Sequence, residues 1–109
     1  LGHEAVFCIE RKSLPDIAAC FHTDRFEREL QRMAGFRHAF LLIEAPWSFI
    51  REGRARLHTR VNQKALAEFL AGLPFRYGVH VACELDRPSA QRLAASLIEK
   101  YLRNVLRSA

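Results

Sequence analysis

Four charged residues follow a short apolar run near the start of the sequence, in an order that could do chemistry. The run covers residues 5–9, and Glu10, Arg11, Lys12 and Asp16 come after it. If the run is a strand, Glu10 and Lys12 share one face of it, because side chains two residues apart point the same way. The carboxylate is a hard oxygen ligand suited to Mg²⁺ or Mn²⁺. The lysine beside it could orient or deprotonate a water, or neutralise charge on a phosphate.

Taken alone, this Glu-x-Lys pattern has a simpler interpretation. A strand that ends at the protein surface also carries charged residues there, and for the bare tripeptide that interpretation is favoured. The elements around the pattern therefore decide whether these residues can form a site.

Three short apolar runs predict the strands of a sheet. They cover residues 5–9, 39–43 and 79–83, and they end at Glu10, Glu44 and Glu84 respectively. Continuous apolar runs of this length are typical of strands buried on both faces, as in a parallel sheet. Open sheets of this kind place their ligand sites at the carboxyl ends of the strands. Glu10 and Lys12 stand at such an end.

Amphipathic patterns predict helices between and after these strands. Their N-caps are expected at Ser13, Thr23, Asn62 and Asp86, and the second and third helices are expected to end at Gly35 and Gly72. The last helix carries an apolar stripe from Leu93 to Val105, which indicates core packing, although a protruding end could serve a dimer. The order strand, helix, helix, strand, loop, helix, strand, helix predicts an α/β fold, a three-layer sandwich with a mostly parallel central sheet.

The bulk composition is that of one domain with a basic surface. A chain of 109 residues with 50% apolar residues holds a single core, and its net charge is +5. This charge fits a polyanionic partner or, equally, a basic surface kept for solubility. The cysteines Cys8, Cys20 and Cys83 form no metal or redox motif, and a reducing compartment suits them. No apolar run is long enough to span a membrane.

A longer pattern around the charged residues favours a functional site over a plain strand end. Ile9-Glu10-Arg11-Lys12 followed by three residues and Asp16 resembles the Glu-Arg-Lys-x-x-x-Asp signature of XPF-family nucleases. Residues 24–30, Asp-Arg-Phe-Glu-Arg-Glu-Leu, are similar to that family's helix beginning Gly-Arg-Leu. Residues 40–44, Phe-Leu-Leu-Ile-Glu, are similar to its Leu-Leu-Ile-Glu strand. The resemblance covers residues 5–45, and the rest of the chain matches only by the order of its elements.

The resemblance implies a restriction-endonuclease-like fold and a role in DNA repair. The implied activity is hydrolysis of branched, flapped or forked DNA by an endonuclease that uses Mg²⁺ or Mn²⁺. Glu10 then corresponds to a metal ligand, with the carbonyl of Arg11 as a second one, and Lys12 to the catalytic lysine. Arg11 and Asp16 take the positions of residues that contact phosphate and orient the site.

The sequence departs from the family in one respect. The family has a Gly-Asp pair before Glu-Arg-Lys, whose Asp is a metal ligand, and no such pair precedes Glu10. Either the Asp lies before Leu1 in a longer parent protein, which we favour, or Glu4 replaces it. On the first alternative, residues 1–109 are a single nuclease domain without its N-terminal strand or strands. If neither holds, the chain is an inactive DNA-binding subunit that pairs with an active nuclease. A third alternative is an α/β protein whose resemblance is accidental.

Further candidates lie beyond the signature. Glu44 could touch the metal, directly or through water, or pair with a nearby arginine. Arg25 could hold Glu10, contact DNA or be a plain surface residue. Residues 47–64 are expected to be a basic loop on DNA, with Trp47 and Phe49 covering the core; its basic residues are Arg51, Arg54, Arg56, Arg60 and Lys64.

The remaining expectations concern histidine, assembly and location. His80 lies within an apolar run and is expected in the core, away from catalysis. The implied partner is DNA, and the last helix permits a homodimer or a heterodimer. The expected location is the cytoplasm, at the nucleoid, or the nucleus in a eukaryote.

Overall fold

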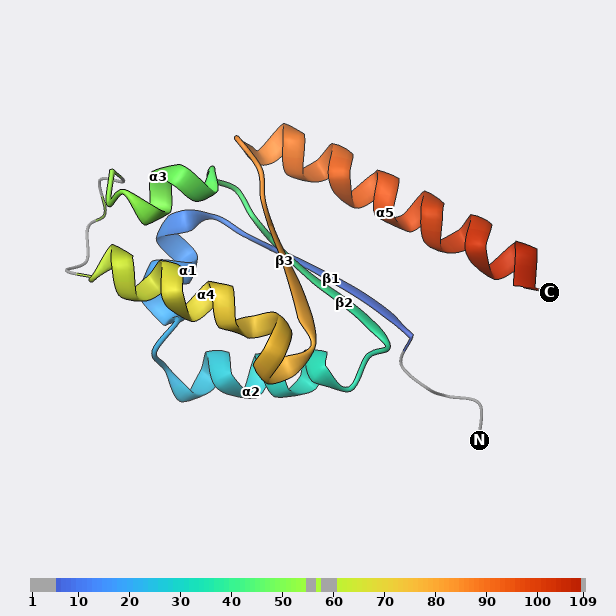
Figure 1. Ribbon diagram of the computed structural model, residues 1–109, viewed down its shortest axis with the longest axis horizontal. Helices are drawn as coiled ribbons and strands as arrows, with labels where there is room; N and C mark the ends of the chain where they lie inside the picture. The colour runs from blue at the N-terminus through green and yellow to red at the C-terminus, as the bar shows by residue number, and fades with distance from the viewer. Residues whose placement is uncertain (1–5, 55–56, 58–60, 109) are drawn as a thin grey trace.

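Three parallel strands form the centre of the molecule. The computed structural model describes residues 6–54, 57 and 61–108. Strands β1 (Phe7–Lys12), β2 (His38–Ile43) and β3 (Val79–Cys83) pair in the order β1-β2-β3. Figure 1 shows them at the centre of the molecule, between the helices. Phe7 lies opposite His38, and Ala39 lies opposite Val79. The strands therefore lie where the apolar runs predicted them, and their carboxyl ends share one edge.

Helices cover both faces of the sheet, which confirms the predicted three-layer α/β sandwich. Helices α1 (Leu14–Cys20), α2 (Asp24–Ala34) and α4 (Gln63–Tyr77) lie on one face, with the short α3 (Trp47–Arg51) beside α4 (Figure 1). Helix α5 (Arg87–Ser108) lies on the other face, where Tyr101 stacks on Phe7 at 4.8 Å between ring centroids. The sheet thus has a thick helical layer on one side and a single helix on the other.

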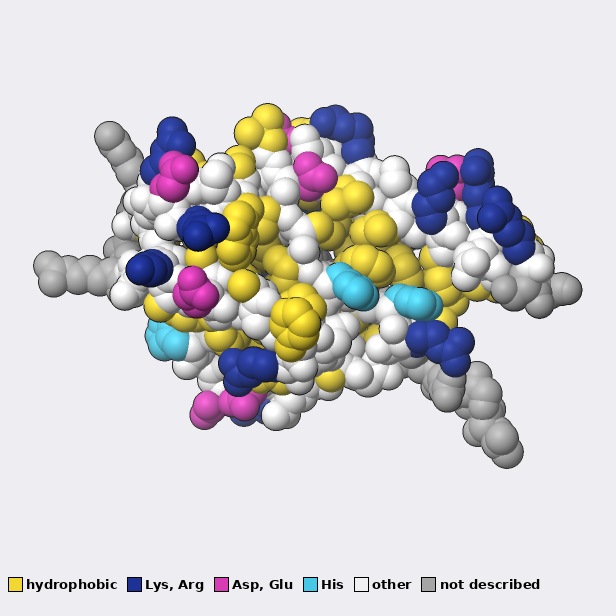
Figure 2. All heavy atoms as spheres, in the orientation of Figure 1, with side chains coloured by type: hydrophobic (Ala, Val, Ile, Leu, Met, Phe, Trp, Pro, Cys, Tyr) yellow, Lys and Arg dark blue, Asp and Glu magenta, His cyan; other side chains and the backbone are white. Residues whose placement is uncertain are grey.

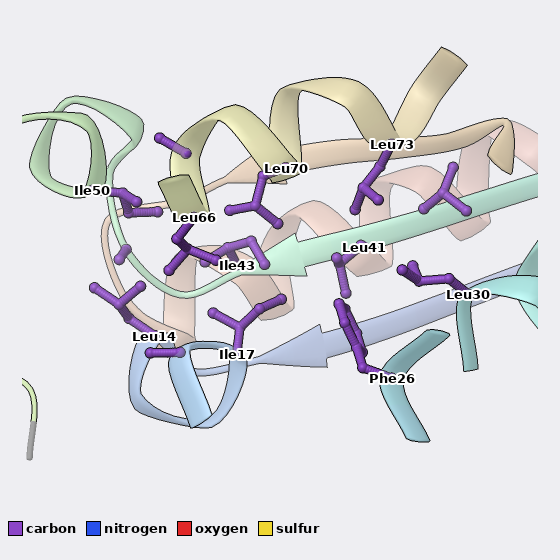
Figure 3. Close-up of a cluster of buried hydrophobic side chains, with 14 of the residues drawn as sticks. Leu14, Ile17, Phe26, Leu30, Leu41, Ile43, Ile50, Leu66, Leu70 and Leu73 are labelled. Atoms are coloured by element: carbon purple, nitrogen blue, oxygen red, sulfur yellow. The ribbon is translucent and has the colours of Figure 1, made fainter. Parts of the chain in front are cut away.

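The hydrophobic core lies between the sheet and the thicker helical layer. Figure 3 shows side chains from α1, α2 and α4 meeting those of β2, with Ile17, Phe26 and Leu41 among them. Each of these three side chains is at most 1% exposed. Burying an apolar side chain of this size stabilises the fold by about 1.5–3 kcal/mol. The core therefore joins α1, α2 and α4 to β2, the strand beside the one that carries Glu10 and Lys12.

The predicted helix starts are confirmed by side-chain caps. The Ser13 hydroxyl accepts from the Asp16 N–H at 3.2 Å, and the Thr23 hydroxyl accepts from the Phe26 N–H at 3.3 Å. The side chains of Asn62 and Asp86 cap α4 and α5 in the same way. Each cap satisfies an N–H that the helix itself leaves unpaired, which is why these residue types mark helix starts.

Two predictions about the positions of helices were wrong. Helix α4 does not end at Gly72 but continues to Tyr77, and Gly78 ends it with a φ of 68°. A glycine inside a helix costs about 1 kcal/mol, and burial of Leu70 and Leu73 on either side of Gly72 outweighs that cost. The expected loop over residues 47–64 also contains a helix, α3, whose Ile50 is fully buried.

The exposed side of β3 gives a third correction. His80 was expected in the core, but its side chain is exposed and lies beside Phe40, with 5.1 Å between ring centroids. The strand alternates its faces, so His80 points to the side of α5, while Val79 points into the core. As the edge strand, β3 leaves this side of the sheet open at His80.

Helix α5 packs on the sheet with only part of its apolar stripe. Leu93, Leu97 and Tyr101 are half-buried, whereas Leu102 and Leu106 are 52% and 74% exposed. The helix runs past the end of the sheet (Figure 1). The stripe is therefore only half-buried on the sheet in its first half and lies outside the core cluster, contrary to the predicted core packing, and its second half protrudes. Among the described helices, none is both long enough and apolar enough to cross a bilayer.

Candidate active site

Glu10 and Lys12 lie on one face of β1, as their spacing predicted, and both reach α2. The Arg32 guanidinium donates to Glu10 Oε1 at 2.9 Å, and Lys12 Nζ lies 3.4 Å from Glu29 Oε1. The four charges alternate in sign along two neighbouring elements. This arrangement fixes the direction of both side chains at the carboxyl end of the strand.

Glu29 and Arg32 were not among the predicted site residues. They lie three residues apart on α2, each directly before a buried residue, Leu30 and Met33. A charged residue beside the buried stripe of a helix stands at the boundary between core and solvent, where it can reach a neighbouring strand. Their position beside the buried stripe can be read from the sequence. The strand that each residue contacts depends on how α2 packs against the sheet.

Lys12 is held from two sides. Its ammonium group lies 5.7 Å from the centre of the Phe26 ring, within the range of a cation–π interaction, besides its contact with Glu29. Its side chain is 20% exposed. Lys12 is therefore a largely covered cation that still opens to the surface, as a residue acting on a phosphate must.

A hollow of about 530 Å³ adjoins Lys12. Lys12, Asp16, Arg25 and Glu29 supply its charged lining, and Cys20 lies among them. The structure thus brings Arg25, a separate candidate, to the same hollow as Lys12 and Asp16 of the predicted signature. Two cations and two carboxylates around one hollow can receive a phosphate and orient a water near it.

Cys8 lies on the same face of β1 as Glu10. Burial raises the pKa of the Cys8 thiol above its ordinary value and the charge of Glu10 raises it further, while the neighbouring Arg32 lowers it.

Arg11 and Glu44 lie on the opposite face of the sheet. Arg11 Nη1 is 3.9 Å from Glu44 Oε2, and Arg87 Nε is 4.0 Å from the same oxygen. Glu44 is thus a strand-end carboxylate paired with arginines, the alternative to its role as a metal ligand. The structure does not bring it to Glu10, because the two side chains leave the sheet on different sides.

The structure describes only part of the basic segment that follows β2. Arg51 and Lys64 are exposed, and Arg54 pairs with Glu52 at 2.9 Å, while Arg56 and Arg60 lie outside the described residues. Trp47 and Phe49 pack against the core, as predicted. The exposed cations are available to an anionic partner without disturbing the fold.

The described residues of this face offer a divalent cation one carboxylate, that of Glu10. Over residues 6–54, 57 and 61–108, no group of three or more His, Cys, Asp or Glu side chains is placed to enclose a metal. Glu10 contributes one carboxylate, 33% exposed. Mg²⁺ commonly binds through one or two carboxylates and completes its shell with water and substrate phosphate. Glu4, the candidate replacement for the family Asp, lies outside the described residues.

Comparisons with known proteins agree with this fold. A family model described as the ERCC4 domain matches residues 1–97. Among solved structures, XPF from Aeropyrum pernix is similar in fold, with a TM-score of 0.61 and 20% sequence identity. The match covers 94% of this chain and 53% of that one, so the chain spans about half the length of the archaeal protein. No curated protein matches the chain.

Proposed function

This chain belongs to the ERCC4 domain family of DNA repair nuclease-type domains, and on that premise we propose that it is a metal-dependent endonuclease that cuts branched, flapped or forked DNA. The observation that supports this most is the placement of Glu10 and Lys12. They share one face of β1 at the carboxyl end of the sheet, and Lys12 lines a hollow that also has Asp16, Arg25 and Glu29 in its wall. This is where an open α/β sheet receives its ligand.

Each residue of the site would have its own role. Glu10 would hold Mg²⁺ or Mn²⁺, with the carbonyl of Arg11 as a further ligand, and Arg32 keeps the carboxylate in one orientation. When bound, the cation supplies Lewis acidity to the scissile phosphate. Lys12 orients the attacking water and offsets the charge that develops on the phosphate. Asp16 and Arg25, across the hollow, position the DNA strand, and Arg11 contacts phosphate once it leaves Glu44.

Binding of DNA would use basic residues from two segments of the chain. We assign phosphate contacts to Arg25 and to the basic residues that follow β2, namely Arg51, Arg54, Arg56, Arg60 and Lys64. Such contacts hold the duplex without reading its sequence. They also release counterions, so affinity falls as salt rises. We place this activity where DNA is found, at the nucleoid in the cytoplasm or in the nucleus of a eukaryote.

The test is cleavage of an end-labelled forked DNA by the purified protein. We expect cutting in Mn²⁺ or Mg²⁺ and none in EDTA, because Glu10 alone cannot activate water for attack on a phosphodiester. An uncut linear duplex of the same sequence serves as the control for fork preference. Tight binding of the fork without cutting in either metal would contradict the proposal. It would support the inactive DNA-binding subunit instead, which the single described carboxylate of the metal site keeps open.

We further propose that α5 joins this domain to a second copy or to a related subunit. Domains of this family often form dimers, and the protruding half of α5 exposes Ile98, Leu102, Val105 and Leu106. Figure 2 shows hydrophobic side chains gathered between α4 and α5 on the face drawn. Apolar surface gathered in this way is typical of an interaction site.

Charge at Leu102 should break this interaction. Leu102→Glu is expected to turn a dimer into a monomer in sedimentation equilibrium, because it would bury a carboxylate in an apolar contact. Phe75→Glu, a matched change at a 91% exposed position on α4, should leave the assembly intact. A wild-type protein that sediments as a monomer at all concentrations would refute the homodimer, and the heterodimer would then remain.

A further inference from the structure

Two ion pairs join β1 to α2, and they lie about one helical turn apart. Arg32 pairs with Glu10 at 2.9 Å, and Glu29 pairs with Lys12 at 3.4 Å. Glu29 and Arg32 are three residues apart on α2, so they lie on one side of the helix. Helix α2 therefore gives a partner of opposite charge to each of the two residues on which the proposed reaction depends.

The pair between Lys12 and Glu29 is the more covered of the two. The side chains of Lys12 and Glu29 are 20% and 23% exposed, whereas those of Arg32 and Glu10 are 53% and 33% exposed. Water and salt screen an ion pair on an open surface, and protein around the pair reduces that screening. Glu29 therefore restrains the Lys12 ammonium group more than a fully exposed carboxylate would.

Lys12 needs such a restraint if it acts at a fixed place. A lysine carries its charge on a long flexible stem, and its three N–H donors can point in many directions. The Phe26 ring, 5.7 Å from Lys12 Nζ, attracts the ammonium group toward the ring face. Among the described residues, Glu29 is the carboxylate at ion-pair distance from Lys12, although Asp16 lines the same hollow. Glu29 and the ring thus hold the ammonium group at two points.

We propose that Glu29 is a positioning residue for cleavage, which holds the Lys12 ammonium group at the wall of the hollow before DNA arrives. The inference rests on the proposed function and deepens it. Lys12 and Glu29 both line this hollow. A cation that is already in place stabilises the charge that develops on the phosphate without the cost of reorganisation. The ammonium group has three donors, so its contact with Glu29 leaves others for the phosphate and the attacking water.

The test is a double-mutant cycle on the single-turnover cleavage of forked DNA in Mn²⁺. Glu29→Ala should lower the cleavage rate by about tenfold, because Lys12 then loses its fixed place. The Kd for the fork, measured in EDTA, should not rise, because the substitution removes a negative charge and no contact with DNA. In the Lys12→Ala background, Glu29→Ala should cause no further loss of rate, because Glu29 acts through Lys12.

Two further variants serve as controls. Glu29→Gln keeps an oxygen atom that can accept from the ammonium group, so it should cut within about threefold of the wild-type rate. Glu27→Ala removes a carboxylate from an exposed position on the same helix and should cut like the wild type. Urea denaturation of each variant checks that the fold is kept.

The outcomes separate this inference from the proposed function. Cleavage by Glu29→Ala at the wild-type rate would overturn the positioning role and leave the nuclease in place. An equal loss of rate in the wild-type and Lys12→Ala backgrounds would also overturn it, since Glu29 would then act independently of Lys12. Glu29→Gln that cuts as slowly as Glu29→Ala would point instead to a metal ligand, because an amide replaces a charged carboxylate poorly there. A wild type that does not cut in Mn²⁺ would contradict the proposed function, and this inference with it.

Discussion

Lys12→Ala is expected to reduce metal-dependent cleavage of forked DNA by at least about a hundredfold. Glu10→Ala should have an effect of the same order. Lys12 is the cation that adjoins the hollow from the end of β1, and Glu10 is the carboxylate that shares its face. Removing a group that stabilises charge in the transition state acts on the rate of the chemical step. Single-turnover cleavage rates in Mn²⁺ measure this directly.

Both variants should remain folded and bind DNA. Lys12 and Glu10 are partly exposed, and neither belongs to the buried core. Arg28→Ala, at an exposed position on α2, removes a positive charge without touching the site and should cut at the wild-type rate. Circular dichroism and the Kd for the fork check folding and binding. If Lys12→Ala and Glu10→Ala both cut like the wild type, the assignment of the active site is wrong.

Phe26→Ala should lower the free energy of unfolding by about 3–5 kcal/mol. Phe26 is 1% exposed, and its ring lies 6.1 Å from that of Phe69 between α2 and α4. The substitution leaves a cavity in the core and removes the ring beneath Lys12. Domains of this size are stable by about 5–15 kcal/mol, so the loss is a large share of the total.

Urea denaturation measures this loss of unfolding free energy. The urea concentration at the midpoint should fall, while the slope of the free energy against urea concentration stays the same. Phe75→Ala removes the same side chain at a position that is 91% exposed, and should change stability by no more than about 0.5 kcal/mol. If Phe26→Ala and Phe75→Ala lose the same stability, Phe26 does not anchor α2. Phe26→Leu keeps most of the buried volume, so this variant should stay folded. It therefore separates the contact between the Phe26 ring and the Lys12 ammonium group from the stability of the core.

Much of the fold could be predicted from the sequence because its signals are local. The three strands follow from continuous apolar runs, and the four caps follow from side chains that bond to an N–H three residues on. Where a local rule met a stronger long-range term, it failed. Gly72 is a plausible helix end by residue type, yet burial of its neighbours carries α4 to Gly78.

The face that Glu10 and Lys12 share was likewise determined by the sequence, since a strand repeats its side-chain direction every two residues. Their partners were not. The pairing of Glu10 with Arg32 joins residues far apart in the chain, and it exists only because α2 packs against β1 in one position. The exposure of His80 and the turn of Glu44 toward Arg11 depend in the same way on which face of the sheet each helix covers. Periodicity and capping act within a few residues and can therefore be predicted from the sequence. Contacts between helices and strands depend instead on how the core packs.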